Sequence, residues 1–376
     1  MKRLSLLRNV LIGSAVAAAG AVAATTTMAG NAPPATDTPR PGIAAQFPGD
    51  VGIDQHPAVL LVETFESASL DDVIDRWDWS RGADAGMLAL DDEVDRPANS
   101  PGRQALRMTV GRDGPSSADL RKILDHRHDR IHLRFYVRFA EDYGFMHHFT
   151  RIAGDAQPTT WMRGGAGSRP TSRFSAAIET MPASPNHYPR RVHTTPPGFW
   201  FFYTYWPGMR SWQTPAGEPD GRPNAYYGNN LMPAEPVAAK RGAWQCIEIM
   251  VRMNSQPGVK DGALALWVEG ELVGHWDPQM NEPAQGYWMR DTFRWVPDEE
   301  QARDFPGFAW LTTDDPAELA SYRHIVQLHH YVSDRTWRRT QRYAEEHPDF
   351  PINLEAATVW KDHVVVATDY IGPMGE

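Results

Sequence analysis

Polar and apolar side chains alternate along four segments of this chain, and the polar ones are of types that do chemistry. The first segment is 173–179 (RFSAAIE), and its apolar side chains are Phe174, Ala176 and Ile178. Successive side chains of a β-strand point to opposite faces, so Arg173, Ser175 and Glu179 should share the other face. Arginine suits carboxylate binding, and serine and glutamate add polar contacts. This face is therefore a candidate ligand-binding groove.

The segment 199–206 (FWFFYTYW) is aromatic on both faces. Tyr203 and Tyr205 share one face with Phe199 and Phe201. A strand with rings on both faces either lies between two packed layers or lines a sugar-binding cleft on one side. Both alternatives stay open, and the tyrosines mark the face that would line the cleft.

The segment 325–332 places Gln327, His329 and Tyr331 on one face, opposite the apolar side chains Val326, Leu328 and Val332. Tyrosine and histidine can both transfer protons. The Gln-x-His pair resembles the Gln-Ile-His motif of the family-seven alginate lyases. His330, on the apolar side, is predicted to be a hydrogen-bonded structural histidine.

The segment 145–154 (FMHHFTRIAG), which is predicted to be a strand over 145–152, adds His148 and Arg151, although its hydrophobicity does not decide their face. Its adjacent histidines cannot both point one way, and no histidine spacing in the chain predicts a metal site. A structural calcium is not favoured, because no acidic Asp-x-Asp loop occurs. We therefore predict no cofactor.

Several other catalytic classes lack their motifs. No strand carries the Glu-x-Asp-x-(x)-Glu pattern that sets two carboxylates about 5 Å apart in laminarinase-type glycosidases. The sequence also contains no serine nucleophile elbow, phosphate-binding loop or dinucleotide fingerprint.

The strongest fold signal is 244–276, which reads as three strands joined by two tight turns. This meander, with Asp-Gly and then Trp-Val-x-Gly, resembles the back sheet of concanavalin A-like jelly rolls found in lectins, laminarinase-type hydrolases and polysaccharide lyases. Short strands separated by Pro/Gly-rich loops extend the pattern to 361–373. We expect an all-β, two-sheet antiparallel jelly-roll sandwich with long loops and one short helix, 334–346, capped by Ser333 or Asp334.

The N-terminus resembles a secretory signal peptide. Lys2, Arg3 and Arg8 precede an apolar run of about 15 residues, shorter than the roughly 20 that span a membrane. We predict a signal peptide (1–29), a disordered linker (30–56) and a single β-jelly-roll domain (57–376), in a secreted or periplasmic bacterial protein without a membrane span. The single cysteine, Cys246, permits no internal disulfide.

The formal net charge of −10 argues against nucleic acid as a partner. An anionic ligand must therefore meet a local cationic groove. The 14 Trp and 12 Tyr exceed what a core of this size needs. Some of these rings should stack on sugars, so the expected partner is an acidic polysaccharide or oligosaccharide.

Four segments taken in order resemble the family-fourteen polysaccharide lyases, which act on alginate or polyglucuronate within a jelly roll. They are 148–154, 173–179, 202–207 and 244–268. The family's Phe-Ser-x-Arg strand is matched by Phe174-Ser175 with Ala177 at the arginine position. Its Tyr-x-Tyr-x-Pro strand is matched by Tyr203 and Tyr205, and its functional lysine by Arg151.

The resemblance implies a lyase that cleaves a uronate polysaccharide by β-elimination. Arg151, with Arg173 as a second candidate, would neutralise the substrate carboxylate. Tyr203, Tyr205 and His329 would transfer protons, while Ser175, Gln327, Tyr331 and His148 would bind substrate. The alternative is a non-catalytic carbohydrate-binding protein of the same fold, which would account for the departures at Arg151 and Ala177. A hydrolase or another role is the third alternative.

Overall fold

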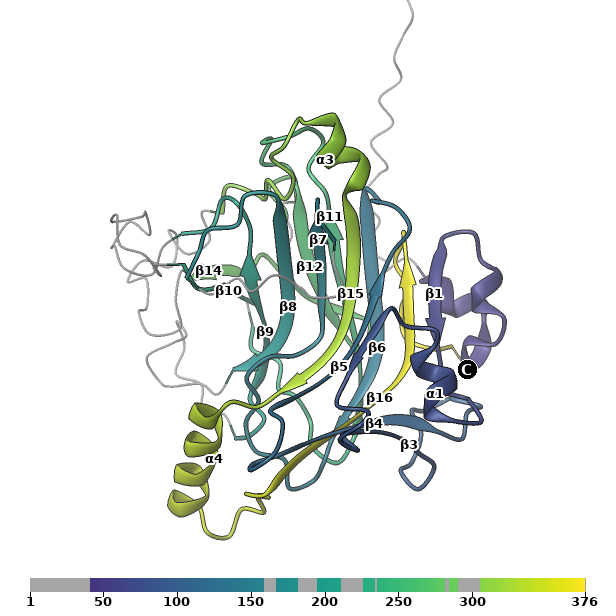
Figure 1. The fold of residues 1–376 in the computed structure, drawn as a ribbon, viewed down its shortest axis with the longest axis vertical. Helices are drawn as coiled ribbons and strands as arrows, with labels where there is room; N and C mark the ends of the chain where they lie inside the picture. Colours follow the sequence, from purple (N-terminus) through teal and green to yellow (C-terminus); the bar gives the residue numbers. More distant parts are fainter. Residues whose placement is uncertain are drawn as a thin grey trace, which may run out of the picture. The chain divides into compact units, whose positions relative to one another are not determined.

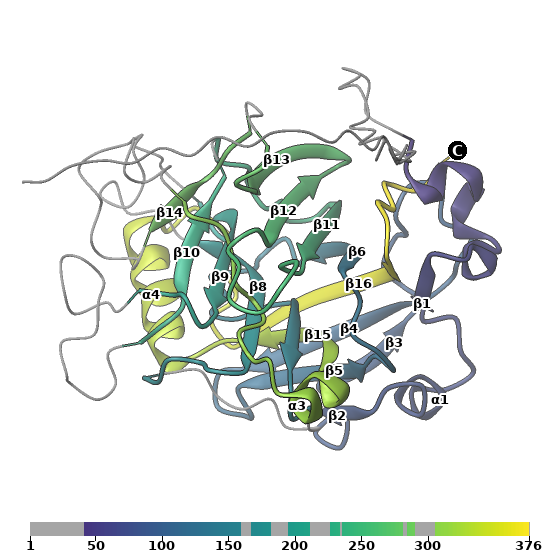
Figure 2. The same ribbon diagram turned by 90° about the horizontal axis from the view of Figure 1, so that it is seen from above.

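The computed structural model describes residues 41–158, 167–181, 195–210, 226–233, 235–280, 284–289 and 305–375. These residues form two β-sheets, and the two sheets pack face to face (Figures 1 and 2). The predicted signal peptide and the linker residues before Pro41 lie outside the described residues. Within the described part of the chain, no helix is long and apolar enough to cross a membrane.

The first sheet contains β1 (Val59–Glu63), β3 (Leu88–Asp91), β4 (Ala105–Gly111), β6 (Arg130–Phe139), β11 (Trp244–Arg252), β12 (Ala263–Val268), β13 (Glu271–Trp276) and β16 (Ala356–Ala367). The second contains β2 (Trp79–Arg81), β5 (Ser117–Ile123), β7 (Arg151–Asp155), β8 (Arg173–Met181), β9 (Phe199–Tyr205), β10 (Asn229–Met232), β14 (Tyr287–Met289) and β15 (Arg323–Tyr331). Their orders are β13-β12-β11-β6-β16-β4-β3, with β1 also on β16, and β14-β10-β9-β8-β7-β15-β5-β2. All these strand pairs are antiparallel.

This architecture is the predicted all-β, two-sheet jelly-roll sandwich. The meander expected over 244–276 is β11, β12 and β13. The alternation of side chains explains the sandwich, because each sheet turns its apolar set inward to one shared core. From β8, for example, Phe174, Ala176 and Ile178 enter this core.

Among the described residues, three short α-helices accompany the sheets: α1 (Leu70–Ile74), α3 (Pro316–Ser321) and α4 (Asp334–Glu346). The predicted helix is α4, and the Ser333 hydroxyl caps it by accepting a hydrogen bond from the Thr336 amide at 3.3 Å. The prediction of one helix was incomplete, because α1 and α3 are too short to show an apolar period of 3.6 residues.

The predicted strand over 145–152 is correct only from Arg151 onward, where β7 begins. The residues before it are irregular, and His148 makes an isolated antiparallel bridge to Tyr331. The sequence could not show where the strand begins, because a short apolar run without proline fits a strand and a packed loop equally well.

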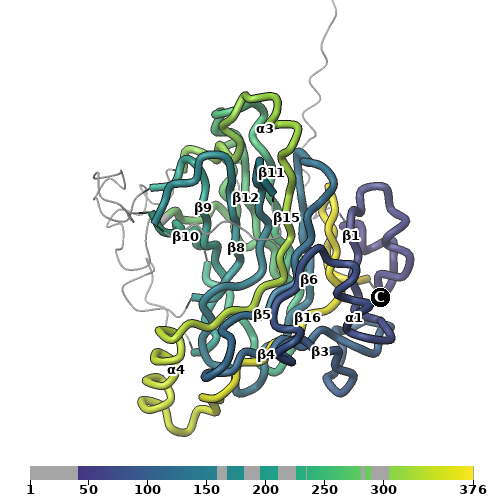
Figure 3. Tube along the Cα trace, in the orientation of Figure 1, coloured from purple at the N-terminus to yellow at the C-terminus, as the bar shows by residue number. Residues whose placement is uncertain are grey.

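The linker prediction is wrong for Pro41–His56, which is ordered against the first sheet. Three turns of 3-10 helix, η1 (Ile43–Gln46), η2 (Pro48–Asp50) and η3 (Ile53–Gln55), cover its outer face. Ile43 and Ile53 pack on Val365 and Ile371, and the Ile43 amide donates to the Tyr370 carbonyl at 3.0 Å. Figure 3 shows this purple segment beside the chain's C-terminal end. Few apolar residues are enough to hold this segment on the sheet, because a buried ion pair also joins the two.

That ion pair joins Asp50 in η2 to Arg134 in β6. Arg134 Nη2 lies 2.7 Å from both Asp50 carboxylate oxygens, and both side chains are buried. Burial alone would raise the pKa of Asp50, but Arg134 and His363 hold it below its ordinary value. The ionised carboxylate therefore stabilises the folded state above about pH 4, and this contribution is lost as the pH falls further.

Arg134→Met should lower the free energy of unfolding by about 3–5 kcal/mol, because it leaves the Asp50 carboxylate buried without its cation. Urea denaturation at neutral pH measures the loss. Arg107→Met is the matched control: Arg107 is 44% exposed and lies 3.4 Å from Asp91, so we expect a loss under about 1 kcal/mol. Equal losses in the two variants would contradict the role given to the buried pair.

Candidate active site

One transverse row of side chains crosses the outer face of the second sheet. The strand register pairs Gln327 with Arg151, Arg151 with Ala177, Ala177 with Tyr203, and Tyr203 with Asn230. Side chains paired in this way lie on one face. The neighbouring residues of the same strands enter the core, so the row points away from it: they are Val326, Ile152, Ala176, Phe202 and Leu231. Five strands thus each contribute one residue to this surface.

Arg151 is held by His329 and Asp119. Its Nη2 donates to His329 Nδ1 at 2.6 Å, and His329 Nε2 lies 3.5 Å from Asp119 Oδ1. Gln327 Nε2 also donates to Asp119 Oδ1. The guanidinium can only donate, so His329 Nδ1 must be the unprotonated nitrogen. Burial, followed by Arg151, lowers the pKa of His329 well below its ordinary value. His329 is therefore a neutral imidazole whose Nδ1 accepts from Arg151 and whose Nε2 lies near Asp119.

A buried lysine supports this arrangement from the core side. Lys361 of β16 crosses from the first sheet, and its Nζ donates to Thr150 Oγ1 at 2.6 Å and to the His329 carbonyl at 3.0 Å. The same Nζ lies 3.9 Å from the ring centroid of Phe149. Burial lowers the pKa of Lys361 well below its ordinary value. The residue ties the backbone under His329 to the opposite sheet.

His148 and Glu179 form a second polar pair. His148 Nδ1 lies 2.7 Å from Glu179 Oε1. Burial raises the pKa of Glu179 to about 8, against the opposing effects of His147 and Arg151. Burial and Arg151 lower the pKa of His148, so its imidazole is neutral. The His148 side chain is still 28% exposed, which makes it the more accessible of the two histidines.

The two tyrosines lie on the same side of β9, and Tyr203 is beside His148. Their hydroxyls are 3.3 Å apart, and the ring centroids of Tyr203 and His148 are 5.5 Å apart. Burial raises the pKa of both hydroxyls, that of Tyr203 well above 10. Trp200 and Phe202 enter the core, and Tyr205 is also buried and belongs to the same hydrophobic cluster. Tyr203 is half-buried, so it is the more accessible of the two hydroxyls.

Tyr331 completes a cluster of rings. Its ring is stacked on His148 at 5.5 Å and on His329 at 6.0 Å between centroids. His330 points the other way, where its Nε2 is 2.8 Å from the Tyr143 hydroxyl in the core. His330 is thus the hydrogen-bonded structural histidine that the alternation predicted.

Two predicted residues lie further along β8 from Ala177, and the nearer of them adjoins Tyr205. Ser175 pairs with Tyr205 and is buried, two residues along β8 from Ala177. Arg173 begins β8, four residues from Ala177, or about 13 Å at 3.3 Å per residue. Arg173 therefore does not share a ligand atom with Arg151. It lies toward one end of the same face.

Sequence reasoning missed Asn230 and left Glu179 without a role. Asn230 is buried on the outer-face row, and neither atom of its amide has a hydrogen-bond partner within the described chain. A buried amide normally has partners, so Asn230 is unusual among the described residues. The sequence carried no signal for it, because β10 is short and polar. Glu179 lacked a role because its partner comes from a different segment.

The outer face is locally cationic although the protein is acidic. The guanidinium carbons of Arg121 and Arg81 lie 4.3 Å and 5.0 Å from the ring centroid of Trp79. Arg121 pairs with Gln327 in the strand register, next to Arg151. Asp119 lies among the three arginines, so the local charge stays positive.

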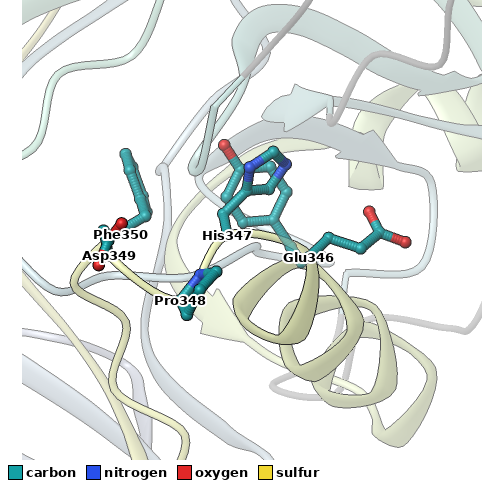
Figure 4. A pocket seen from close by; sticks show the side chains of 6 residues that line it. Glu346, His347, Pro348, Asp349 and Phe350 are labelled. Atoms are coloured by element: carbon teal, nitrogen blue, oxygen red, sulfur yellow. The ribbon is translucent and has the colours of Figure 1, made fainter.

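The described residues contain no group of three or more His, Cys, Asp or Glu side chains that could hold a metal ion. A separate pocket lies where α4 ends, lined by Tyr343, Glu346, His347, Pro348, Asp349 and Phe350 (Figure 4). It contains none of the residues assigned above.

Comparison with known proteins gives structural likeness only. No protein-family model and no curated protein matches the chain. Similar solved structures include alginate lyase Aly36B, at 11% identity and a TM-score of 0.42, covering 83% of this chain and 98% of that one. Alginate lyase vAL-1 from Chlorella virus has 10% identity, a TM-score of 0.39 and coverages of 78% and 99%. The laminarinase from Rhodothermus marinus has 11% identity and a TM-score of 0.38, and the match covers 83% of this chain and 97% of that one. Function is therefore argued from the site itself.

Lys361→Met should keep or raise stability at neutral pH, because an apolar side chain of similar length removes a buried charge. The unfolded state binds more protons than the folded state between the lowered pKa and about 10.4, so wild-type stability rises with pH there. Urea denaturation at several pH values should show the difference between variant and wild type shrinking toward pH 10. A loss above about 3 kcal/mol at pH 7 would identify the ammonium as a net stabiliser instead.

Proposed function

We propose that this protein is a secreted or periplasmic polysaccharide lyase that cleaves a uronate-containing polysaccharide by β-elimination. The observation that carries the proposal is the shared outer face of the second sheet. There a fixed guanidinium, a neutral accessible imidazole and a pair of protonated tyrosines lie together. β-Elimination needs these three functions: a cation for the carboxylate, a base for the C5 proton and an acid for O4.

Arg151 binds the C6 carboxylate in this mechanism. Burial lowers its pKa and Asp119 offsets this, and an arginine keeps its proton at neutral pH. His329 and Asp119 fix the orientation of its guanidinium. Neutralising the carboxylate makes the C5 proton more acidic, because the carbanion that forms can delocalise into it. Asn230 offers an amide to the same substrate.

His148 takes the C5 proton. An ionised Glu179 accepts the hydrogen on Nδ1, which leaves Nε2 unprotonated. The carboxylate then stabilises the imidazolium that results. The sequence analysis assigned proton transfer to His329 together with Tyr203 and Tyr205. His329 Nδ1 already accepts a hydrogen bond from Arg151, and its side chain is only 10% exposed, so we assign it to positioning Arg151.

The tyrosine pair supplies the proton for the leaving group. Because burial raises their pKa values, Tyr203 and Tyr205 stay protonated when the C4–O4 bond breaks. O4 receives the hydroxyl proton, a C4=C5 double bond forms, and the tyrosine recovers its proton from solvent or from His148. Every proton removed is thus returned.

A non-catalytic carbohydrate-binding protein is the second candidate. The observation in its favour is Ala177, which lies between Arg151 and Tyr203 where the resembled lyases carry an arginine. Such a protein would use the ring cluster of His148, His329 and Tyr331 for stacking.

Purified protein incubated with alginate, glucuronan, pectate, ulvan and glycosaminoglycans should release an unsaturated product from at least one of them, measured by ultraviolet absorbance. His148→Ala and Tyr203→Phe should each lower turnover by about 100-fold or more with substrate binding largely kept, because proton transfer contributes about that much. Tyr343→Phe, which keeps a half-buried ring in the separate pocket at the end of α4 and removes only a hydroxyl, is the matched control. Binding by calorimetry without product from any substrate would favour the binding protein.

The rate should rise with pH through about 8, the pKa of Glu179. Below that pH the protonated carboxyl donates to His148 Nδ1, so Nε2 carries the hydrogen and cannot act as a base. In Glu179→Gln the amide donates to Nδ1 at every pH, so the rise should disappear and the rate should stay low. A wild-type kcat/KM that is flat between about pH 6 and 9 would contradict the role of this pair.

A further inference from the structure

A second cluster lies on the outer face of the first sheet. It joins three residues remote in sequence: Asp50 in η2, Ser100 in the loop between β3 and β4, and His363 in β16. His363 Nε2 is 2.7 Å from Ser100 Oγ, and His363 Nδ1 is 2.9 Å from Asp50 Oδ2. One imidazole therefore bridges a hydroxyl and a carboxylate through its two nitrogens.

The ion pair with Arg134 fixes the proton positions in this bridge. Arg134 holds Asp50 ionised, and an ionised carboxylate only accepts hydrogen bonds. His363 must then donate through Nδ1, and in the neutral imidazole this leaves Nε2 to accept the hydrogen of the Ser100 hydroxyl. This is the protonation pattern that activates a serine nucleophile.

Backbone strain concentrates at the same place. The described chain has five non-glycine residues with positive φ, and two of them are Asp50 (61°) and His363 (46°). Two more precede residues of the cluster: Asn99 (68°) before Ser100, and Phe65 (60°) before Glu66. A shift of register in β16 between Asp362 and Val365 turns His363 outward. Such strain persists where the surrounding structure fixes a functional geometry.

Two backbone amides beside Ser100 bind an oxyanion. The amides of Arg103 and Gln104 donate to Glu66 Oε1 at 2.6 Å and 2.8 Å. A Cβ atom added at Gly102 would lie 2.7 Å from that oxygen and 3.2 Å from Ser100 Oγ, so the two oxygens border one small space. The Glu66 carboxylate is exposed and can leave. It occupies the position that the oxygen of a tetrahedral intermediate would take.

We propose that Ser100, His363 and Asp50 form a second catalytic centre, which hydrolyses carboxylic esters with the Arg103 and Gln104 amides as its oxyanion hole. Ser100 Oγ attacks the ester carbonyl carbon while His363 Nε2 takes the hydroxyl proton. The ester C–O bond breaks, and the leaving alkoxide receives that proton as an alcohol. Water then attacks the acyl-serine through the same base, releasing the carboxylic acid and restoring Ser100. Arg134 is a positioning residue for Asp50.

This centre is independent of the proposed lyase site, because it lies on the other sheet and shares no residue with it. Ser100 is half-buried at the surface, so the ester must be presented from outside the protein. An acyl group carried by a larger molecule meets that condition.

The test treats the full-length protein with a fluorophosphonate probe and locates the label by peptide mass spectrometry, with p-nitrophenyl acetate hydrolysis as a second readout. We expect label on Ser100 and none in Ser100→Ala. Glu66→Ala vacates the oxyanion position, so its labelling rate should rise by about 10-fold or more, the order of effect seen for oxyanion-hole groups. Ser116→Ala, which removes an exposed serine, is the control and should match the wild type.

The thermal unfolding midpoint of each variant separates loss of chemistry from loss of fold. If Ser100→Ala does not fold, Ser100→Cys keeps the nucleophile, and its thiol should react with iodoacetamide faster than free cysteine at pH 7. Folded wild type and Glu66→Ala that both leave Ser100 unlabelled would overturn the proposal and leave the cluster as a structural network. Ester hydrolysis that persists undiminished in Ser100→Ala would overturn it as well.

Discussion

The alternation of side chains in the second sheet is the constraint on which both the core and the candidate site depend. The strands β7, β8, β9 and β15 each send one set of side chains into the shared core. Because the period is two, the other set must gather on the outer face. A slip of one residue in β15 would place Gln327 and His329 in the core and turn Leu328 outward. The packing energy of the sandwich therefore also sets the positions of the polar residues.

The sequence predicted the faces well and the contacts between strands poorly. Alternation alone put Ser175, Gln327 and His329 on the outer face and His330 in the core, and capping chemistry placed α4 at its first residue. Periodicity says nothing about which strands become neighbours. The bonds from Arg151 to His329 and from His148 to Glu179 therefore had to come from the tertiary structure. The order of Pro41–His56 was missed for the same reason, since its buried partner, Arg134, lies in a distant strand.

The local charge and the protonation states at the candidate site differ from what the net charge of the chain indicates. A chain with a formal charge of −10 keeps a cationic surface because its arginines lie close together around one aspartate. Burial also keeps the two imidazoles uncharged beside them. Neutral histidines next to guanidinium groups remain proton acceptors at a pH where exposed histidines begin to charge. Recognition of an anion and acceptance of a proton thus become compatible within a few ångströms.

The irregular register of β16 links the two faces of the molecule. Before the shift, Lys361 points through the core to the carbonyl of His329; after it, His363 points outward to Asp50 and Ser100. Val364 and Val366 regain the core only because one extra residue resets the parity of the strand. Deleting that residue would exchange inside and outside for the rest of the strand. A surface loop would tolerate the insertion or deletion of one residue. In this part of β16 the same change would disturb both the residues around His329 and the cluster of Asp50, Ser100 and His363.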